Sequence, residues 1–277
     1  METRRCMRSL RMNALPAILI LTPVKNAKDC LASYLAGIGR LDYPPGLLSL
    51  ALLESDSSDG TFERFSEALA GLDQRLASAR IWKRDFGFRI PPGRNRWDAG
   101  IQKQRRSILA RSRNYLLSRA LREQDWVLWL DVDIIDYPPD LLQRLLATGK
   151  DIVQPHCVKE FGGPTFDRNA WRDHGRLCMD QLRGEGELVE LHAVGGTALL
   201  VRADIHREGL IFPTFFFGRS EPRARRDNRC HSALDFLRGW RGDYRGEIET
   251  EGLGIMAHAM GYHCYGMPHF EIRHRDA

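Results

Sequence analysis

The sequence predicts an α/β fold in which a mainly parallel sheet is covered by helices on both faces. Through the first 155 residues, short apolar runs alternate with segments of helical apolar spacing. The chain has 277 residues, of which 43% are hydrophobic and 28% charged, as in an ordinary globular protein. Its longest nearly apolar run, residues 15–24, holds ten residues. A membrane-spanning helix needs about 20, so we expect none.

Each element is predicted by its pattern of apolar residues. Short continuous runs predict buried strands, and apolar residues three or four apart predict helices. In chain order we predict a strand at 17–21, a helix at 29–38, a strand at 48–54, a polar turn at 55–60, a helix at 61–76, a strand at 81–88, a loop at 91–100, a helix at 102–121, a strand at 126–130, a helix at 140–146 and a strand at 151–155.

The order of elements changes after residue 155. We predict strands at 188–192 and 197–201, a helix at 248–260, and short strands at 262–265 and 269–273. Residues 219–245 are rich in Arg, Asp and Gly and predict a long mobile loop with one short helix at 233–237. The chain is therefore predicted to have a flexible basic N-terminus at 1–15 and a single domain at 16–277.

The charge and the cysteines narrow the class of protein. Lys and Arg number 41 against 36 Asp and Glu, which gives a net charge of +5. This balance suits anionic partners, such as a nucleotide diphosphate or an anionic membrane surface, or is simply a mildly basic surface. Basic residues are not interleaved with aromatic ones as in nucleic-acid binders, so no nucleic-acid partner is expected. The six cysteines form no C-x-x-C pair, which argues against a structural zinc site and fits a reducing compartment.

The strongest chemical signal is Asp131-Val132-Asp133, directly after the apolar run at 126–130. Ligands of open α/β sheets bind beyond the carboxyl ends of the strands. Two carboxylates there would repel each other unless a cation lay between them, and hard divalent cations commonly bridge carboxylates to phosphates. The pattern therefore predicts Mn²⁺ or Mg²⁺ held with a nucleotide diphosphate. The alternative is a turn in which the aspartates only cap a helix.

Two further signals point to a nucleotide. Asp56 lies in the turn at 55–60, where its carboxylate would accept hydrogen bonds from a nucleobase or ribose, or would close an Asx turn. Arg106 and Arg113 are seven residues apart and share one face of the helix at 102–121. Guanidinium groups bind phosphate in a two-point fashion, although a run of charges is also typical of a solvated helix.

Seven blocks of the sequence resemble the fungal mannan-polymerase type of α-mannosyltransferase, glycosyltransferase family 62. They are ILILTPVKNA (18–27), ESDSSDGT (54–61), QRRSILARSRNYLLSRAL (104–121), WVLWLDVDI (126–134), DIVQP (151–155), VGGTALLVRADIHREGLIFP (194–213) and ETEGLGIMAHAMGYHCYGMPHFEIRH (249–274). The resemblance implies a GT-A (Rossmann-like) fold, GDP-mannose as donor, a divalent metal with Mn²⁺ preferred to Mg²⁺, and transfer with retention to a glycan or glycoconjugate hydroxyl. It further implies a nucleotide-sugar-binding half at 16–155 and an acceptor-binding half at 156–277.

The same resemblance implies roles for individual residues. Asp131, Asp133 and His274 would hold the metal, with Asp133 as the more direct ligand. Gly195-Gly196 would admit a sugar close to the backbone, or form a plain tight turn. The glutamates at 249 and 251 would bind sugar hydroxyls, or are solvated acids at a helix start. The implied catalytic residues are Asp131, Asp133, Glu251 and Arg113; the donor-binding residues are Thr22, Pro23, Val24, Asp56, Arg106, Arg113 and Asp131; the acceptor-binding residues are Gly195, Gly196 and Glu249.

The chain also departs from the fungal pattern. It shows no N-terminal membrane anchor, so we expect a cytoplasmic protein, either free or in peripheral contact with the inner membrane surface. The stretch at 219–245 is longer and richer in arginine than the family leads us to expect, so the acceptor is not carried over, and no oligomeric state is predicted. Two alternatives stay open: an inverting GT-A enzyme that uses a UDP-sugar, and a non-catalytic relative that binds sugar nucleotides.

Overall fold

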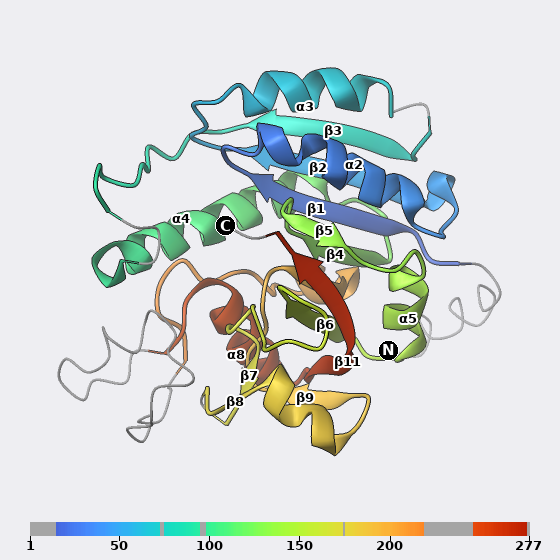
Figure 1. Cartoon of the computed structure of the whole chain (residues 1–277), viewed down its shortest axis with the longest axis vertical. Coiled ribbons are helices and arrows are strands. Elements are labelled where there is room, and N and C mark those ends of the chain that lie inside the picture. The colour runs from blue at the N-terminus through green and yellow to red at the C-terminus, as the bar shows by residue number, and fades with distance from the viewer. Residues whose placement is uncertain (1–14, 73–74, 95–97, 174, 219–245, 276–277) are drawn as a thin grey trace.

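The computed structural model of the chain describes residues 15–72, 75–94, 98–173, 175–218 and 246–275 (Figure 1). The flexible N-terminus predicted at 1–15 lies, except for Leu15, outside the described residues, as does the mobile loop predicted at 219–245. So does the short helix predicted at 233–237. Within the described part, no helix is both long and apolar enough to cross a membrane.

Nine of the described strands form one sheet in the order β3-β2-β1-β4-β10-β6-β11-β5, with β9 paired to β11. Strands β7 and β8 form a separate pair. The bounds are β1 Ile18–Val24, β2 Leu48–Glu54, β3 Ser78–Lys83, β4 Trp126–Leu130, β5 Ile134–Asp136, β6 Ile152–Val158, β7 Trp171–Arg172, β8 Leu177–Cys178, β9 Val189–Leu191, β10 Ala198–Arg202 and β11 Cys264–His274.

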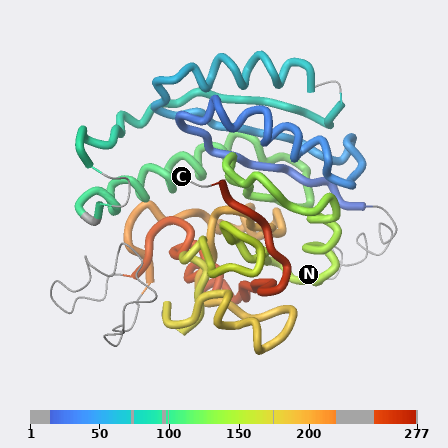
Figure 2. The backbone as a smooth tube through the Cα atoms, viewed as in Figure 1, coloured from blue at the N-terminus to red at the C-terminus, as the bar shows by residue number. Residues whose placement is uncertain are grey.

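The sheet is parallel in its N-terminal part and mixed beyond it. Strands β3, β2, β1 and β4 pair in parallel, whereas β10 is antiparallel to both of its neighbours, β4 and β6. Strand β11 is parallel to β6 but antiparallel to β5 and β9. Figure 2 shows this division as blue and cyan segments at one end of the sheet and yellow to red segments at the other.

Helices cover both faces of the sheet, as predicted. Alternate residues of β1 serve two cores: Ile18 and Ile20 pack with α2, α3 and α5, while Leu19 and Leu21 pack with α4, α6 and α8. This alternation follows from the two-residue period of a strand. The helices are α2 Leu31–Arg40, α3 Thr61–Ala70, α4 Ala99–Ala120, α5 Leu141–Ala147, α6 Ala203–Arg207 and α8 Glu249–Ala259, with 3₁₀ turns η2 Lys28–Cys30, η3 Pro45–Leu47 and η4 Met179–Glu185.

Several predicted boundaries are wrong. The strand predicted at 81–88 lies at Ser78–Lys83, and the helix predicted to reach residue 76 ends at Ala70. Helix α4 begins at Ala99, where the Asp98 side chain accepts a hydrogen bond from the backbone N–H of Gly100 (2.8 Å). The two short strands predicted near the C-terminus form one strand, β11, whose register shifts between Met267 and Glu271. Pro268 lies in this irregular stretch, because it has no N–H to donate to a ladder.

The topology brings distant parts of the chain to one edge of the sheet. Strands β1, β2, β4, β6 and β11 all run in the same direction, and β10 runs in the opposite one. The carboxyl end of β4 with Asp131, the carboxyl end of β11 with His274, and the amino end of β10 with Thr197 therefore meet at the same edge. This edge carries the candidate site.

Candidate active site

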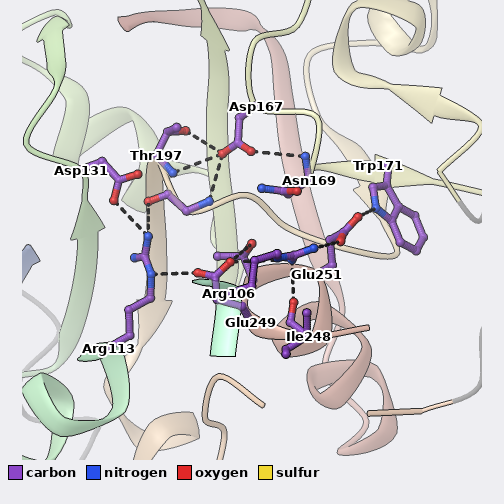
Figure 3. Close-up of polar contacts among 12 residues, drawn as sticks. Arg106, Arg113, Asp131, Asp167, Asn169, Trp171, Thr197, Ile248, Glu249 and Glu251 are labelled. Carbon is purple, nitrogen blue, oxygen red and sulfur yellow. Dashed lines mark hydrogen bonds and ion pairs between the residues drawn. The ribbon is translucent and has the colours of Figure 1, made fainter. Parts of the chain in front are cut away.

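A buried arginine joins the carboxylate after β4 to the start of α8 (Figure 3). The Nη2 atom of Arg113, on α4, lies 3.0 Å from Asp131 Oδ1, and its Nε atom lies 3.0 Å from Glu249 Oε1. The Arg113 side chain is only 4% exposed. Burial alone would lower the pKa of Arg113, but Asp131 and Glu249 raise it overall, so the guanidinium stays charged.

A second buried arginine, Arg106, holds the glutamates of α8. Its Nη1 atom lies 2.7 Å from Glu251 Oε2, and its Nη2 donates to the carbonyl of Ile248 (2.6 Å). The other carboxylate oxygen of Glu251 accepts a hydrogen bond from Trp171 Nε1 (2.6 Å). Glu251 is completely buried, and both of its oxygens already have partners within the protein. This contradicts the solvated reading of the two glutamates, because Glu249 is buried as well.

Asp133 and His274 face each other at the end of β11. His274 Nε2 lies 3.1 Å from Asp133 Oδ2, and His274 Nδ1 bonds to the carbonyl of Arg275. A carbonyl only accepts, so Nδ1 carries the proton, and the Nε2 of a neutral ring would point its lone pair at the carboxylate. A cation is therefore needed between the two groups. Burial lowers the pKa of His274, but the hydrogen bond and charge of Asp133 raise it overall, so without a metal a proton takes that place.

Carboxylates outnumber cations around Asp131. Burial raises the pKa of Asp131 to about 7; Arg113 opposes this rise, while Asp133, Asp167 and Glu249 add to it. The surplus of carboxylate oxygens and the single imidazole are ligands that Mn²⁺ accepts. The residues present thus fit a divalent cation bound by Asp133 and His274 beside Asp131.

Asp167, which was not predicted, organises the turn that precedes β10. Its Oδ2 atom accepts hydrogen bonds from the backbone N–H of Gly196 (3.0 Å) and from both the N–H and the hydroxyl of Thr197 (3.2 and 3.0 Å). A Cβ atom on Gly195 would overlap the Asp167 carboxylate, and one on Gly196 would lie 2.6 Å from Arg113 Nη2. The two glycines are therefore required by the close approach of Asp167 and Arg113.

Glu249 has two energetically unfavourable features, a left-handed backbone conformation and a buried carboxylate. Its φ angle is +62°, a left-handed conformation that is rare for residues other than glycine, and its side chain is 5% exposed. The backbone is held there because the N–H of Glu249 donates to the carbonyl of Pro213 (2.9 Å), and Thr250 Oγ1 donates to Glu249 Oε2 (3.0 Å). Backbone strain of this kind is concentrated at functional sites.

The predicted donor residues at the ends of β1 and β2 are engaged within the fold. Thr22 is completely buried, and its hydroxyl donates to the Leu130 carbonyl (2.7 Å) and bonds the Tyr34 hydroxyl (2.6 Å). Val24 is buried, and Pro23 is partly exposed. The Asp56 carboxylate accepts hydrogen bonds from the backbone N–H groups of Phe86 (3.1 Å) and Gly87 (2.8 Å). These contacts join the turn at 55–60 to the segment after β3; they are not the Asx turn considered for Asp56, which would use an N–H of the same turn.

Comparison with known proteins identifies the family. The sequence profile of the Anp1 family matches residues 7–181 and 172–216. The chain belongs to the Anp1 family. It is 27% identical to the mannan polymerase II complex anp1 subunit of Schizosaccharomyces pombe, over 93% of this chain and 63% of that protein. It is 28% identical to the mannan polymerase complex subunit mnn9 of the same yeast, over 94% of this chain and 80% of the relative.

The chain spans only part of several relatives, 54% in the case of the ANP1 subunit of Saccharomyces cerevisiae, with 25% identity. More distant human relatives match about half of this Anp1-family chain. They are an inactive glycosyltransferase 25 family member (28% identity over 57% of this chain, 26% of that protein) and procollagen galactosyltransferase 2 (29% over 50%, 22% of that protein). The sequence resemblance to mannan-polymerase proteins is thereby confirmed.

Among solved structures, GalNAc-T7 with UDP, GalNAc and Mn²⁺ superposes with a TM-score of 0.55. The identity is 12%, and the match covers 95% of this chain and 44% of that one. Identity this low carries no information on substrate, but the overlap shows a common fold. The predicted GT-A glycosyltransferase fold is confirmed.

Proposed function

We propose that this Anp1-family chain is a metal-dependent retaining glycosyltransferase that transfers mannose from GDP-mannose to a hydroxyl group of a glycan or glycoconjugate. The observation that carries the proposal is the convergence of Asp131, Asp133 and His274 at one edge of a GT-A sheet, beside a buried arginine. The names of the yeast relatives, which are subunits of mannan polymerase complexes, favour mannose as the sugar.

In this proposal Asp133 and His274 hold Mn²⁺, and Asp131 completes the site. The metal supplies neutralisation of the negative charge that develops on the departing diphosphate. Two features of the chain support this assignment: the distance of 3.1 Å between His274 Nε2 and Asp133 Oδ2, and the pKa of Asp131, which burial raises first and the neighbouring carboxylates raise further.

Arg113 is assigned to the donor. Its Nη1 atom is buried and has no hydrogen-bond partner among the residues that the structure describes. A phosphate or sugar oxygen of the donor would satisfy this nitrogen, and a preorganised buried cation stabilises developing negative charge strongly. Arg106 and Glu251 are assigned a positioning role, because their mutual contacts hold the start of α8 and thereby Glu249, the proposed acceptor-binding carboxylate.

Two alternatives stay open. A UDP-sugar donor with inversion is compatible with the same fold, because the fold alone does not decide the donor or the stereochemistry. A non-catalytic protein that binds a sugar nucleotide is favoured by the human relative named as inactive. The first experiment therefore measures the melting temperature with GDP, UDP and ADP, each with and without Mn²⁺, because a ligand of the native state raises it by mass action.

A Mn²⁺-dependent rise with GDP alone supports the proposal, and a rise with UDP alone overturns the mannose assignment. Hydrolysis and transfer of GDP-mannose are then measured for the wild type, for Asp133→Asn and for Asp136→Asn. Asp136 is a matched control, because it lies three residues away and its side chain is 44% exposed in a 3.7 Å pair with Arg273. We expect Asp133→Asn to lose about 10³-fold in turnover and Asp136→Asn to retain it. Equal activity of the two variants would contradict the role of Asp133 as a metal ligand.

Retention is tested separately, by NMR of the anomeric configuration of the product.

A further inference from the structure

A second cluster of metal-ligating side chains lies at the other end of α8. Glu190 is on β9, His258 is in the last turn of α8, and His263 lies in the turn before β11. One nitrogen or oxygen atom from each of these three residues lies within 4.8 Å of the other two. His258 is nine positions after Glu249, so with a rise of 1.5 Å per residue the cluster lies about 14 Å along the helix from the active-site end.

The fold holds these three residues together through backbone pairing. Strand β9 is antiparallel to β11, with Glu190 opposite Tyr265. His258 Nε2 donates a hydrogen bond to the carbonyl of Leu191 (2.8 Å). In a neutral ring this bond leaves Nδ1 as the unprotonated nitrogen. An imidazole that donates one N–H to a backbone carbonyl and uses its other nitrogen as ligand is the usual arrangement at metal sites.

The remaining contacts show that the side chains already converge. His263 Nδ1 lies 2.6 Å from Glu190 Oε1. The His258 ring makes edge-on contacts with the rings of His263 and His192, with centroids 5.6 and 5.9 Å away.

We propose that Glu190, His258 and His263 bind a Zn²⁺ ion at a site separate from the active-site metal. Two imidazoles and one carboxylate are a ligand set that Zn²⁺ uses with a fourth, open position. The set is a poor match for Mg²⁺ or Ca²⁺, which prefer oxygen ligands. The fourth position is filled by water or by His192. The absence of C-x-x-C pairs in the sequence does not bear on such a site, because no cysteine takes part.

The ligands can reach zinc geometry with small movements. Ligand atoms around a tetrahedral Zn²⁺ are about 3.4 Å apart, given metal–ligand distances of about 2.1 Å. The side chains of His263 and Glu190 are 60% and 43% exposed, so both are free to rotate and the ion can enter from solvent. Bound zinc would link β9, the end of α8 and the start of β11, and would stabilise the native chain by mass action.

The test is Zn²⁺ titration of the full chain, without a polyhistidine tag, by calorimetry and by melting temperature. His263→Ala removes one ligand. His269→Ala is the matched control, because His269 is also exposed and follows on β11 but bonds the carbonyl of Arg183 outside the cluster. Asp133→Asn separates this site from the proposed active-site metal. We expect the wild type and His269→Ala to bind one Zn²⁺ more than His263→Ala, or to bind it at least about tenfold more tightly. The same difference is expected between Asp133→Asn and the double variant Asp133→Asn/His263→Ala, in which the active-site metal position is removed from both proteins.

Identical zinc binding by His263→Ala and the wild type would overturn the proposal, as would a wild type that binds no zinc. A Glu190→Gln variant provides a second measurement that removes the carboxylate and keeps all three histidines; it is also expected to lose the site. Because zinc binding is read directly and in the Asp133→Asn background, the outcome does not depend on the proposed transferase activity.

Discussion

At Gly195 and Gly196 the absence of a Cβ atom allows two active-site side chains to approach the backbone. The Asp167 carboxylate and the Arg113 guanidinium approach the backbone so closely at these positions that neither leaves room for a Cβ atom. A sequence alone cannot distinguish this reason from the predicted access of a sugar, because both require glycine. In the structure the two glycines place Asp167 and Arg113, and through Arg113 also Asp131.

We predict that Gly195→Ala destabilises the chain by about 1–3 kcal/mol, because the added methyl group displaces Asp167 from the hydrogen bonds that it accepts. The matched control is Gly39→Ala, at an exposed position of α2 with nothing within 4 Å of the added carbon. That variant should be unchanged or more stable by about 0.5 kcal/mol. Urea unfolding of both variants measures the difference; equal stability would contradict the close approach.

His206 predicts a specific dependence of stability on pH. Its Nδ1 donates to the Leu210 carbonyl (2.7 Å), and its Nε2 accepts from Trp129 Nε1 (3.2 Å). A proton on Nε2 would place two donors face to face. Burial, which is the main cause, lowers the pKa of His206 to about 4 in the folded chain, whereas the unfolded value is about 6.5.

The unfolded chain therefore takes up a proton at a pH where the folded chain does not. The contribution of His206 to stability is complete above pH 6.5 and is lost as the pH falls towards 4, by up to about 3 kcal/mol. Glutamine can both donate and accept hydrogen bonds but does not titrate. In His206→Gln, the free energy of unfolding should therefore change less between pH 6.5 and 4 than in the wild type. The exposed variant His269→Gln should show the same dependence on pH as the wild type. The same slope in all three proteins would contradict the assignment.

Helix α4 shows that apolar spacing predicts a helix but not which of its polar residues are buried. The alternative of a solvated charged face is wrong for four polar residues of this helix, because all of them are buried: Gln102, Arg106, Ser112 and Arg113. Arg106 contacts α8, and Arg113 contacts both α8 and the end of β4. Arginine can be buried there because each guanidinium is paired with carboxylates.

We predict that Arg113→Lys lowers stability by about 2 kcal/mol and abolishes transfer activity. A lysine has one nitrogen, so it cannot reach Asp131 and Glu249 together as Nη2 and Nε of Arg113 do. Arg111→Lys, two positions earlier on the exposed face of α4, is the control and should retain both properties. The melting temperatures and transfer activities of the two variants distinguish these outcomes. An active Arg113→Lys variant would contradict the assignment of Arg113 to the donor site.

The elements that sequence predicted well are those with long apolar patterns. Strands β1, β2 and β4 are buried on both faces and read as continuous apolar runs. Strand β5 was missed because it has three residues, and Asp167 was missed because it lies in an irregular loop where no strand end or motif marks it. The pairing of Arg106 with Glu251 joins residues 145 positions apart, and this information exists only in the folded chain.

For the whole molecule, the sheet does not separate at residue 155. Strand β10, from the C-terminal half, lies between β4 and β6 of the N-terminal half and pairs with both. We predict that a fragment of residues 15–160 shows no cooperative thermal transition, because β4 and β6 would each lose their shared neighbour. Circular dichroism of the fragment and of the full chain tests this, and the full chain should unfold in one transition by both dichroism and tryptophan fluorescence. A cooperative transition of the isolated fragment would show that the halves fold independently.

The place of β11 also has a consequence for how the protein is made. It is the last described strand of the chain, yet it supplies a neighbour to β5, β6 and β9 and ends at His274. During synthesis on the ribosome, one edge of β6 stays open until β11 has been translated, and open strand edges invite pairing with other chains. The proposed metal site is likewise assembled only after translation has passed His274.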